Sequence, residues 1–303
     1  MKKTKTGYVT ILGLPNSGKS TLLNSLLGQK LSIITKKPQT TRKQILGILT
    51  EGNYQIIFLD TPGILKPNYL LQEKMMDFVL SSVYDADIVL IMVDVFDDKD
   101  GKKILNNETV KKIIDNKSKP IILLLNKIDL SNEEYIKKLI SELEETKNFV
   151  KIIPISAQHK MNIKSILSEI LELLPQGPKF YPDDIVSDAN ERFYVSEIIR
   201  EKLLEQYQEE IPYSCEVLIT EFKERKEGKD YISAEIVVER QSQKGIIIGK
   251  GGTALKKMGQ TARKSIEEFL EKEVFLELRV KVRENWRSNE NFLRSFGYTK
   301  DKE

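Results

Sequence analysis

The sequence predicts two domains, a doubly wound α/β domain followed by a smaller α+β domain. Between Tyr8 and Leu174, short apolar runs alternate with helical patterns, whereas beyond residue 185 the order becomes helix, two strands, helix and strand. Between the two regions, three prolines and a glycine fall within residues 175–182 and cannot continue a helix. We therefore expect a first domain at 1–176, a linker at 177–184 and a second domain at 185–303.

The first domain is expected to hold a largely parallel sheet. The predicted strands are Tyr8–Leu12, Ile45–Thr50, Tyr54–Asp60, Ile88–Val93, Ile121–Leu125 and Val150–Ser156. The predicted helices are Ser20–Leu27, Leu70–Ser82, Gly101–Asn116, Asn132–Lys147 and Ile163–Leu174. The strands at 88–93 and 121–125 are continuously apolar, as expected when both faces of a strand are buried. Glu51-Gly52-Asn53 predicts a hairpin between the second and third strands.

The second domain is expected to follow a different plan. A helix at Phe193–Tyr207 precedes strands at Glu216–Phe222 and Tyr231–Arg240. A strand-like run, Ile246–Ile248, leads into a glycine-rich loop, which a helix at Thr253–Leu270 and a strand at Val274–Val282 follow.

Composition narrows the class of protein. With 40% hydrophobic and 31% charged residues and a net charge of +3, the chain has the balance of a globular protein. The single Cys215 excludes an internal disulfide, and the single His159 excludes a histidine metal site. We expect Cys215 to be a buried apolar residue and His159 an exposed loop residue. No apolar run approaches the roughly 18 residues of a membrane span, and no signal peptide is indicated, so we expect a cytoplasmic protein.

A phosphate-binding loop (P-loop) is predicted at Gly13–Ser20, between the first strand and the first helix. Glycines let backbone N–H groups turn toward phosphate oxygens, and the helix N-terminus adds positive potential. Lys19 is expected to reach the β- and γ-phosphates, and Ser20 to bind Mg²⁺. The residues expected to contact phosphate here are Gly13, Asn16, Ser17, Gly18, Lys19, Ser20 and Thr21.

A second loop follows the strand that ends at Asp60, with the sequence Asp60-Thr61-Pro62-Gly63. A carboxylate at that strand end suits the shell of a magnesium ion. Gly63 has no side chain, so its N–H group can approach a γ-phosphate closely. The pattern is weak alone and gains weight beside the P-loop.

A third loop, Asn126-Lys127-Ile128-Asp129, selects the base. Guanine presents two adjacent donors, N1–H and the N2 amine, and the Asp129 carboxylate can accept from both. Adenine would leave that desolvated carboxylate unsatisfied. Asn126 can tie this loop to the P-loop, the stem of Lys127 can cover the base, and backbone N–H groups at Ser156-Ala157 can reach guanine O6. The nucleotides predicted are therefore GTP and GDP.

Together these motifs resemble the G domain of the translation-factor-like GTPases over residues 7–175. The resemblance implies a switch threonine that binds Mg²⁺ in the GTP state; Thr41 is the first choice and Thr40 the alternative, with Ser20 and Asp60 completing the metal site. Ile64 stands where Ras-like enzymes place a water-orienting glutamine, so intrinsic hydrolysis should be slow. In the TrmE/Era class, which the P-loop resembles, an asparagine matching Asn16 helps hold a potassium ion. The expected catalytic residues are Asn16, Lys19, Thr41 and Gly63.

The glycine-rich loop of the second domain, Gly249-Lys250-Gly251-Gly252, is a GxxG sequence. Its place in the helix–strand–strand–loop–helix–strand order resembles a type II KH domain, in which this loop clamps single-stranded RNA. Lys244 and Lys250 would supply charge, within a run of basic residues from Arg240 to Arg287. Ile247, Ile248 and Leu255 could line a base groove or simply form core. Trp286 could stack on a base, but packing of the C-terminal segment is the favoured interpretation.

A single G domain followed by one KH-like domain resembles the Era family across nearly the whole chain. Three stretches carry the resemblance: Pro38-Gln39-Thr40-Thr41-Arg42, Asp60-Thr61-Pro62-Gly63, and Ser242-Gln243-Lys244-Gly245 with Gly249-Lys250-Gly251-Gly252. The related Der family carries two G domains, for which this chain has no room. The resemblance implies a factor that binds a single-stranded segment near the 3′ end of 16S ribosomal RNA and assists small ribosomal subunit assembly. It also implies peripheral association with the cytoplasmic face of the cell membrane, although the sequence shows no anchor.

Two other functions remain open from the sequence. One is a GTPase that signals to protein effectors, with the KH-like unit as a docking module. The other is an RNA-binding adaptor whose nucleotide is structural. Basic side chains around Gly249–Gly252 favour RNA over protein effectors, and the intact Lys19, Ser20, Thr41 and Asp60 favour turnover over a structural nucleotide.

Overall fold

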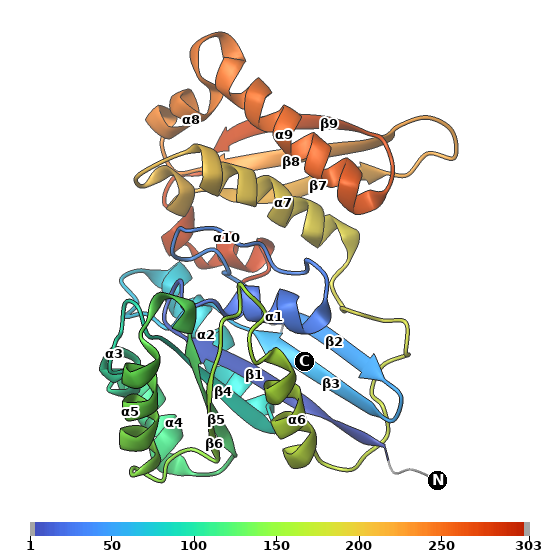
Figure 1. The fold of residues 1–303 in the computed structure, drawn as a ribbon. Coiled ribbons are helices and arrows are strands. Elements are labelled where there is room, and N and C mark those ends of the chain that lie inside the picture. Colours follow the sequence, from blue (N-terminus) through green and yellow to red (C-terminus); the bar gives the residue numbers. More distant parts are fainter. Residues whose placement is uncertain (1–3, 300–303) are drawn as a thin grey trace. The chain divides into compact units, whose positions relative to one another are not determined.

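The computed structural model describes residues 4–299, which divide into two compact units. The first unit comprises the residues up to Lys66 together with Met75–Asp188. The second comprises Pro67–Lys74 and the residues from Ala189 onward. Figure 1 shows a parallel α/β fold in the first unit and an α+β fold in the second, which confirms the predicted fold class.

Six strands of the described chain form the sheet of the first unit, in the order β2-β3-β1-β4-β5-β6. Their bounds are β1 (Lys5–Gly13), β2 (Ile45–Glu51), β3 (Tyr54–Asp60), β4 (Ile88–Asp94), β5 (Ile121–Asn126) and β6 (Lys151–Pro154). β2 pairs antiparallel with β3, as the hairpin signal predicts, and the other pairs are parallel. The carboxyl ends of the parallel strands therefore meet at one edge, where α/β folds bind ligands.

Helices cover both faces of this sheet (Figure 1). Their bounds are α1 (Lys19–Leu27), α2 (Leu70–Asp85), α3 (Lys102–Leu105), α4 (Glu108–Asn116), α5 (Glu133–Glu144) and α6 (Ile163–Leu173). Side chains of α2, α4 and α5 form one apolar core with β4 and β5, while α1 and α6 lie on the other side. Every residue of β4 and β5 is buried, which explains their unbroken apolar sequence.

The predicted helix at Gly101–Asn116 is two helices, because the chain turns at Asn106 and Asn107. The Asn107 side chain accepts hydrogen bonds from the backbone N–H groups of Thr109 and Val110 and so caps α4.

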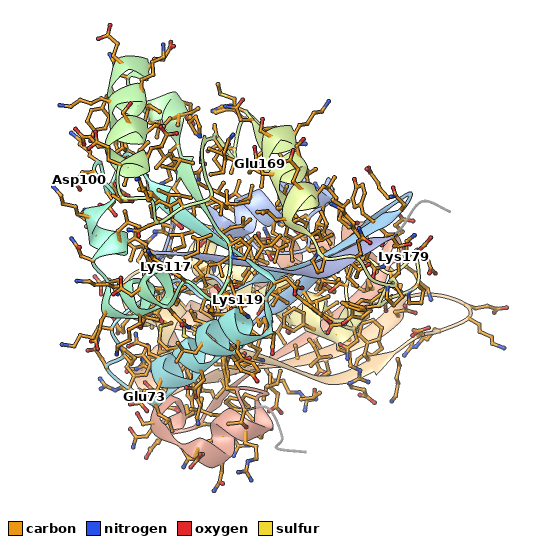
Figure 2. All side chains as sticks on the ribbon, turned by 90° about the horizontal axis from the view of Figure 1, so that it is seen from below. Glu73, Asp100, Lys117, Lys119, Glu169 and Lys179 are labelled. Carbon is orange, nitrogen blue, oxygen red and sulfur yellow. The ribbon has the colours of Figure 1, made fainter. Side chains whose placement is uncertain are left out.

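The segment expected to be a linker lies along the first unit, and the division between the units falls after Asp188. The Gln55 side chain on β3 accepts hydrogen bonds from the N–H groups of Phe180 and Tyr181, at 2.8 and 3.0 Å. The Ile48 N–H of β2 donates to the Val186 carbonyl at 2.9 Å. We call residues 177–188 the strap; Lys179, labelled in Figure 2, pairs with Asp183 within it.

The second unit contains a sheet in the order β7-β8-β9, with β7 antiparallel and β9 parallel to β8. Its elements are α7 (Glu191–Gln206), β7 (Glu216–Lys223), β8 (Asp230–Val238), α8 (Gln241–Ile248), α9 (Thr253–Leu270), β9 (Val274–Val282) and α10 (Glu290–Ser295). Its core joins apolar side chains of α7, the three strands, α8 and α9.

The prediction of a strand-like run at Ile246–Ile248 is wrong, because these residues end helix α8. Three successive isoleucines resemble a buried strand, but only Ile247 is fully buried while Ile246 is 52% exposed. The short α10 near the C-terminus was not predicted either.

Trp286 and Cys215 are both structural. The Trp286 ring is fully buried, and its Nε1–H donates to the Ser214 carbonyl at 3.0 Å. This confirms the packing interpretation and leaves the ring no exposed surface for a base. Cys215 is also fully buried, as expected. No helix among residues 4–299 is long and apolar enough to cross a membrane.

Candidate functional site

A cavity of about 370 Å³ lies in the first unit, among the loops that follow β1, β3, β4, β5 and β6. The predicted nucleotide residues that line it are Asn16, Gly18, Lys19, Ser20, Thr21, Thr41, Gly63, Asn126, Lys127, Asp129, Ser156 and Ala157. Ser17 and Asp60 are buried close behind this wall, and Gly13 ends β1. The fold therefore brings the predicted motifs to one place.

The P-loop joins β1 to α1 in a conformation that suits its residues. Gly18 has φ of 100°, which favours glycine, and a Cβ there would lie 2.3 Å from the Asn126 Nδ2 atom. Lys19 is 6% exposed, and its Nζ donates to the carbonyl oxygens of Gly13 and Leu14 at 3.2 and 3.0 Å. Burial lowers the pKa of Lys19 to about 8, although the nearby Asp60 opposes that shift. The ammonium group is thus held where an anionic phosphate would stabilise its charge.

Three oxygen-bearing side chains gather at the start of α1. The Ser20 Oγ donates to Asp60 Oδ2 at 2.8 Å and lies 2.9 Å from Thr41 Oγ1. Burial raises the pKa of the Asp60 carboxyl, against the influence of Lys19 and of two serine hydroxyls. Asp60 Oδ1 is buried and accepts no hydrogen bond from a described residue. A buried carboxylate oxygen whose lone pairs accept no hydrogen bond from a described residue, beside two hydroxyls, fits a hard divalent cation such as Mg²⁺.

Sequence reasoning missed one member of this group, Ser32. Its hydroxyl donates to Asp60 Oδ2 at 2.9 Å and is fully buried. Serine is common in loops, so nothing in the sequence distinguished Ser32 from its neighbours.

The choice between the two candidate switch threonines has a structural basis. Thr41 lies beside Ser20, whereas the Thr40 hydroxyl donates to the Lys37 carbonyl at 2.7 Å and lies 2.8 Å from Thr35 Oγ1. Thr40 thus stabilises a turn in the loop between α1 and β2, which we call the switch loop. Because the Thr40 hydroxyl is engaged in this turn, Thr41 is favoured as the metal ligand.

Asn16 connects the P-loop to this same switch loop. Its Nδ2 donates to the Lys36 carbonyl at 3.0 Å, and its backbone has φ of 63°. Asparagine tolerates this left-handed conformation better than most residues. The side-chain amide therefore lies next to a main-chain carbonyl of the switch.

Gly63 packs directly against the P-loop. A Cβ at this position would lie 2.7 Å from the Pro15 Cα, so only glycine fits. The next residue, Ile64, donates its N–H to the Gly13 carbonyl at 2.9 Å, and its side chain is 1% exposed. Ile64 is therefore part of the core and offers no group to orient water.

Asn126 joins three loops through one side chain. Its Nδ2 donates to the Ser17 carbonyl at 2.7 Å, and its Oδ1 accepts from the Ala157 N–H at 2.9 Å. The residue is 3% exposed, so these bonds are shielded from water. The predicted tie between the base loop and the P-loop is confirmed, and it extends to the Ser156-Ala157 loop.

Two contacts around the base loop were not predicted from the sequence. Lys127 forms an ion pair with the buried Asp94 at the end of β4, which holds the lysine stem along the cavity. The His159 Nε2 lies 3.6 Å from Asp129 Oδ2. His159 is exposed, as expected, but it lies beside the carboxylate that would read guanine.

The GxxG loop of the second unit connects α8 to α9, with a 3-10 turn at Lys250–Gly252. Gly249, Gly251 and Gly252 all have positive φ, and a Cβ at Gly249 would lie 2.6 Å from the Ala254 Cβ. Lys250 is exposed and Lys244 half-buried, and neither forms an ion pair with a described residue. The loop thus presents backbone and free charge together, as a phosphate clamp requires.

The apolar residues proposed to line a base groove differ in exposure. Ile247 is fully buried in the core of the second unit, whereas Ile248 and Leu255 are only partly buried against it. The structure therefore leaves side-chain surface at Ile248 and Leu255, but none at Ile247.

Comparisons with known proteins agree with this architecture. A family described as 50S ribosome-binding GTPase matches residues 8–127, and a KH domain family matches residues 210–287. The chain is 45% identical to GTPase Era of Clostridium kluyveri over 296 residues, covering 97% of this chain and 99% of that protein. It is 47% identical to the chloroplastic GTPase ERA1 of Zea mays over 297 residues, covering 97% of this chain and 70% of that protein. The chain belongs to the Era family of GTPases.

Solved structures of this family superpose along the whole chain. A variant of Aquifex aeolicus Era bound to GDP and AlF4⁻ has a TM-score of 0.91 at 40% identity, covering 98% of this chain and 100% of that one. Era in complex with MgGDPNP and nucleotides 1506–1542 of 16S ribosomal RNA has a TM-score of 0.91 at 39% identity, covering 98% and 99%. The predicted Era family resemblance is confirmed, and so is the assignment of the first unit as a GTPase domain.

Nucleotide affinity should depend on the charge of Lys19. Phosphate binds the protonated ammonium, so above its pKa of about 8 binding must take up a proton. We expect GDP affinity to fall by up to about tenfold per pH unit between pH 8 and 9. Calorimetric titration at pH 7, 8 and 9 measures this slope. Lys19→Arg keeps its charge and should show a shallower slope; equal slopes in both proteins would contradict the prediction.

Base selectivity should depend on Asp129. In Asp129→Asn, the amide NH₂ faces the N2 amine of guanine, but it can donate to the O2 carbonyl of xanthine. We expect GTP affinity to fall by roughly 5- to 150-fold and xanthosine triphosphate affinity to rise. Competitive binding measures both. Asp97→Asn, which changes another carboxylate of the same cavity, should keep the preference for GTP. Unchanged selectivity in Asp129→Asn would exclude this role.

Proposed function

We propose that this protein is a GTP-hydrolysing switch that binds 16S ribosomal RNA near its 3′ end and assists assembly of the small ribosomal subunit. The observation that carries the proposal is the presence, in one chain, of a cavity lined by the predicted guanine-nucleotide motifs and of a GxxG loop. Lys244 and Lys250, before and in this loop, form no ion pair with a described residue. The complex of a relative with a 3′-terminal segment of that RNA supports the choice of partner.

The first unit supplies the groups for phosphoryl transfer to water. Ser20, Thr41 and Asp60 would hold Mg²⁺, which supplies positive charge to the phosphates when bound. Lys19 would add a second charge, and the N–H of Gly63 would donate to a γ-phosphate oxygen. Because the buried Ile64 cannot orient water, we expect the intrinsic rate to be slow.

We further propose that a potassium ion binds beside Asn16. The side-chain oxygen of Asn16 and nearby switch-loop carbonyls are hard oxygen ligands, and the Asn16–Lys36 contact holds the two elements together. A cation there would neutralise charge that develops between the β- and γ-phosphates, as an arginine does in other GTPases.

Hydrolysis should therefore depend on the monovalent cation. At equal ionic strength, we expect GTP turnover in KCl to exceed turnover in NaCl by about tenfold or more, because each 1.4 kcal/mol of transition-state stabilisation is worth a factor of ten. Phosphate release measures both rates. Asn16→Ala should lose the potassium effect while keeping GDP affinity within about threefold, which reports an intact P-loop. Equal turnover in the two salts for the unmodified protein would exclude the ion.

The second unit is proposed to hold RNA by its backbone. Three glycines of the loop have positive φ and carry no side chain, so the sugar–phosphate chain can approach the backbone. Lys250 lies in the loop, Lys244 precedes it on α8, and Lys256 and Lys257 are exposed near the start of α9. Ile248 and Leu255 supply apolar surface for bases.

The decisive measurement is binding of the full chain to an RNA from the 3′ end of 16S ribosomal RNA at fixed salt, with a GTP analogue, with GDP and with no nucleotide. We expect tighter binding than to an unrelated RNA of equal length, and tightest binding with the GTP analogue. Lys250→Ala should weaken binding and reduce the salt slope by about one phosphate contact. Lys112→Ala, a surface lysine of α4, serves as the control.

Equal, weak binding to both RNAs in every nucleotide state would exclude the ribosomal RNA role. The GTPase assignment would stand, and the alternative function, signalling to protein effectors through the KH-like unit, would then account for the second unit.

The proposed location is the cytoplasm, where bacterial ribosomes assemble. The Zea mays relative is named as chloroplastic, so an organelle of bacterial type is consistent with the same task. Association with the cytoplasmic face of the membrane stays a prediction from the family resemblance.

A further inference from the structure

A short segment after the Asp60–Gly63 loop belongs to the second unit rather than to the first. Gly63 and Ile64 are held against the P-loop through Pro15 and Gly13. Only Leu65 and Lys66 then separate them from Pro67, where the chain enters the second unit and stays until Lys74. Gly63 and Ile64 are therefore separated from the second unit by only two residues of main chain.

Within the second unit, this segment is bound by Arg287. The guanidinium carbon of Arg287 lies 4.8 Å from the centre of the Tyr69 ring, a cation–π distance. Lys74 and Glu290 form a second contact at 3.9 Å, but Glu290 is 64% exposed and the pair is weak. Tyr69 thus attaches the segment to the Arg287 side chain.

Arg287 is also paired with Glu239. Its Nε donates to Glu239 Oε2 at 2.9 Å, and its Nη2 donates to the same oxygen. The two side chains are 23% and 13% exposed, so the pair is largely shielded from water. Because the guanidinium is planar, its position over Tyr69 and its bond to Glu239 are set together.

Glu239 leads on to the RNA loop. The backbone N–H groups of Glu239 and Arg240 both donate to Gln243 Oε1 at 3.0 Å, which fixes the start of α8. Gln243 is 4% exposed. Helix α8 ends at Ile248, and the GxxG loop begins at the next residue. A continuous series of contacts therefore runs from Tyr69 to the loop.

We propose that Tyr69, Arg287, Glu239 and Gln243 form a relay that links the nucleotide state at Gly63 to the RNA affinity of the GxxG loop. The inference rests on the proposed function and adds its route of regulation. Tyr69 and Arg287 act as positioning residues, because neither lines the nucleotide cavity nor lies in the GxxG loop. Coupling of this kind is reciprocal, so RNA bound at the loop favours the GTP-bound arrangement of Gly63 to the same degree.

The test compares RNA dissociation constants with GDP and with a GTP analogue, using the full chain and a 16S 3′-end RNA. In the unmodified protein, we expect the dissociation constant with GDP to exceed that with the GTP analogue by a factor of about 5 or more. This factor is the lower end of typical allosteric coupling. Tyr69→Leu and Arg287→Ala should each bring the ratio close to one. The double variant should do no more than either single variant, because both residues lie on one route.

Two controls separate the relay from general damage. Arg279→Ala removes an arginine that pairs with Glu277 in the same unit, through Nε and Nη2 at 3.0 and 2.8 Å, and should keep the ratio. Tyr69→Leu should keep basal GTP turnover without RNA. If Arg287→Ala does not fold, Arg287→Lys carries the same test, since it keeps the charge but loses the planar contact.

The outcomes are distinct. An unchanged ratio in Tyr69→Leu and Arg287→Ala overturns the relay and leaves the proposed function intact. A ratio of one in the unmodified protein, with specific RNA binding, also overturns the relay alone. Absence of specific RNA binding in every state overturns the proposed function and the relay together.

Discussion

The nucleotide site depends above all on one buried amide. Asn126 binds the Ser17 carbonyl of the P-loop and the Ala157 N–H of the last loop, while its own main chain begins the base-reading loop. Three loops separated by about thirty to one hundred residues therefore share a single rigid reference point. The close approach that this requires also explains Gly18, since any side chain there would occupy the place of the Asn126 amide. Without this junction, phosphate recognition and base recognition would be independent and flexible, and each would lose pre-organisation.

The close packing of the site also buries two charged side chains. Lys19 and Asp60 are both buried, and burial shifts their pKa values toward the neutral forms, downward for the lysine and upward for the aspartate. Each group partly offsets the shift of the other. A phosphate chain and a divalent cation would complete this compensation, because each brings the charge that one of the buried groups needs. The nucleotide and the metal ion would thus meet groups that are already held in place and only partly compensated.

Much of this could be predicted from the sequence, for a physical reason. Phosphate, metal and guanine each demand particular residues at short spacing, so Gly13–Ser20, Asp60–Gly63 and Asn126–Asp129 were recognisable. Asp94, Ser32 and the nearness of His159 to Asp129 were not, because these contacts join residues distant in the sequence and use common residue types. In the second unit, the end of helix α8 was predicted to be strand-like because three successive isoleucines are typical of a buried strand, whereas Ile246 is 52% exposed and Ile247 is fully buried. Gln243 was the available signal for the start of this helix, because its side-chain oxygen accepts a hydrogen bond from the Arg240 N–H just before α8.

The strap also pairs with the outer strand of the sheet in the first unit. β2 is the terminal strand of its sheet, and such a strand exposes unpaired N–H and C=O groups that invite pairing with another chain. Here the Ile48 N–H is taken by Val186, the Ser187 hydroxyl donates to the Leu46 carbonyl, and Tyr181 and Ile185 cover the apolar side chains beneath. The strap, which leads to the second unit, thus also protects the edge of the sheet from pairing with another chain. A GTPase fragment cut at Gln176 would lose that protection, whereas one cut after Asp188 would retain it.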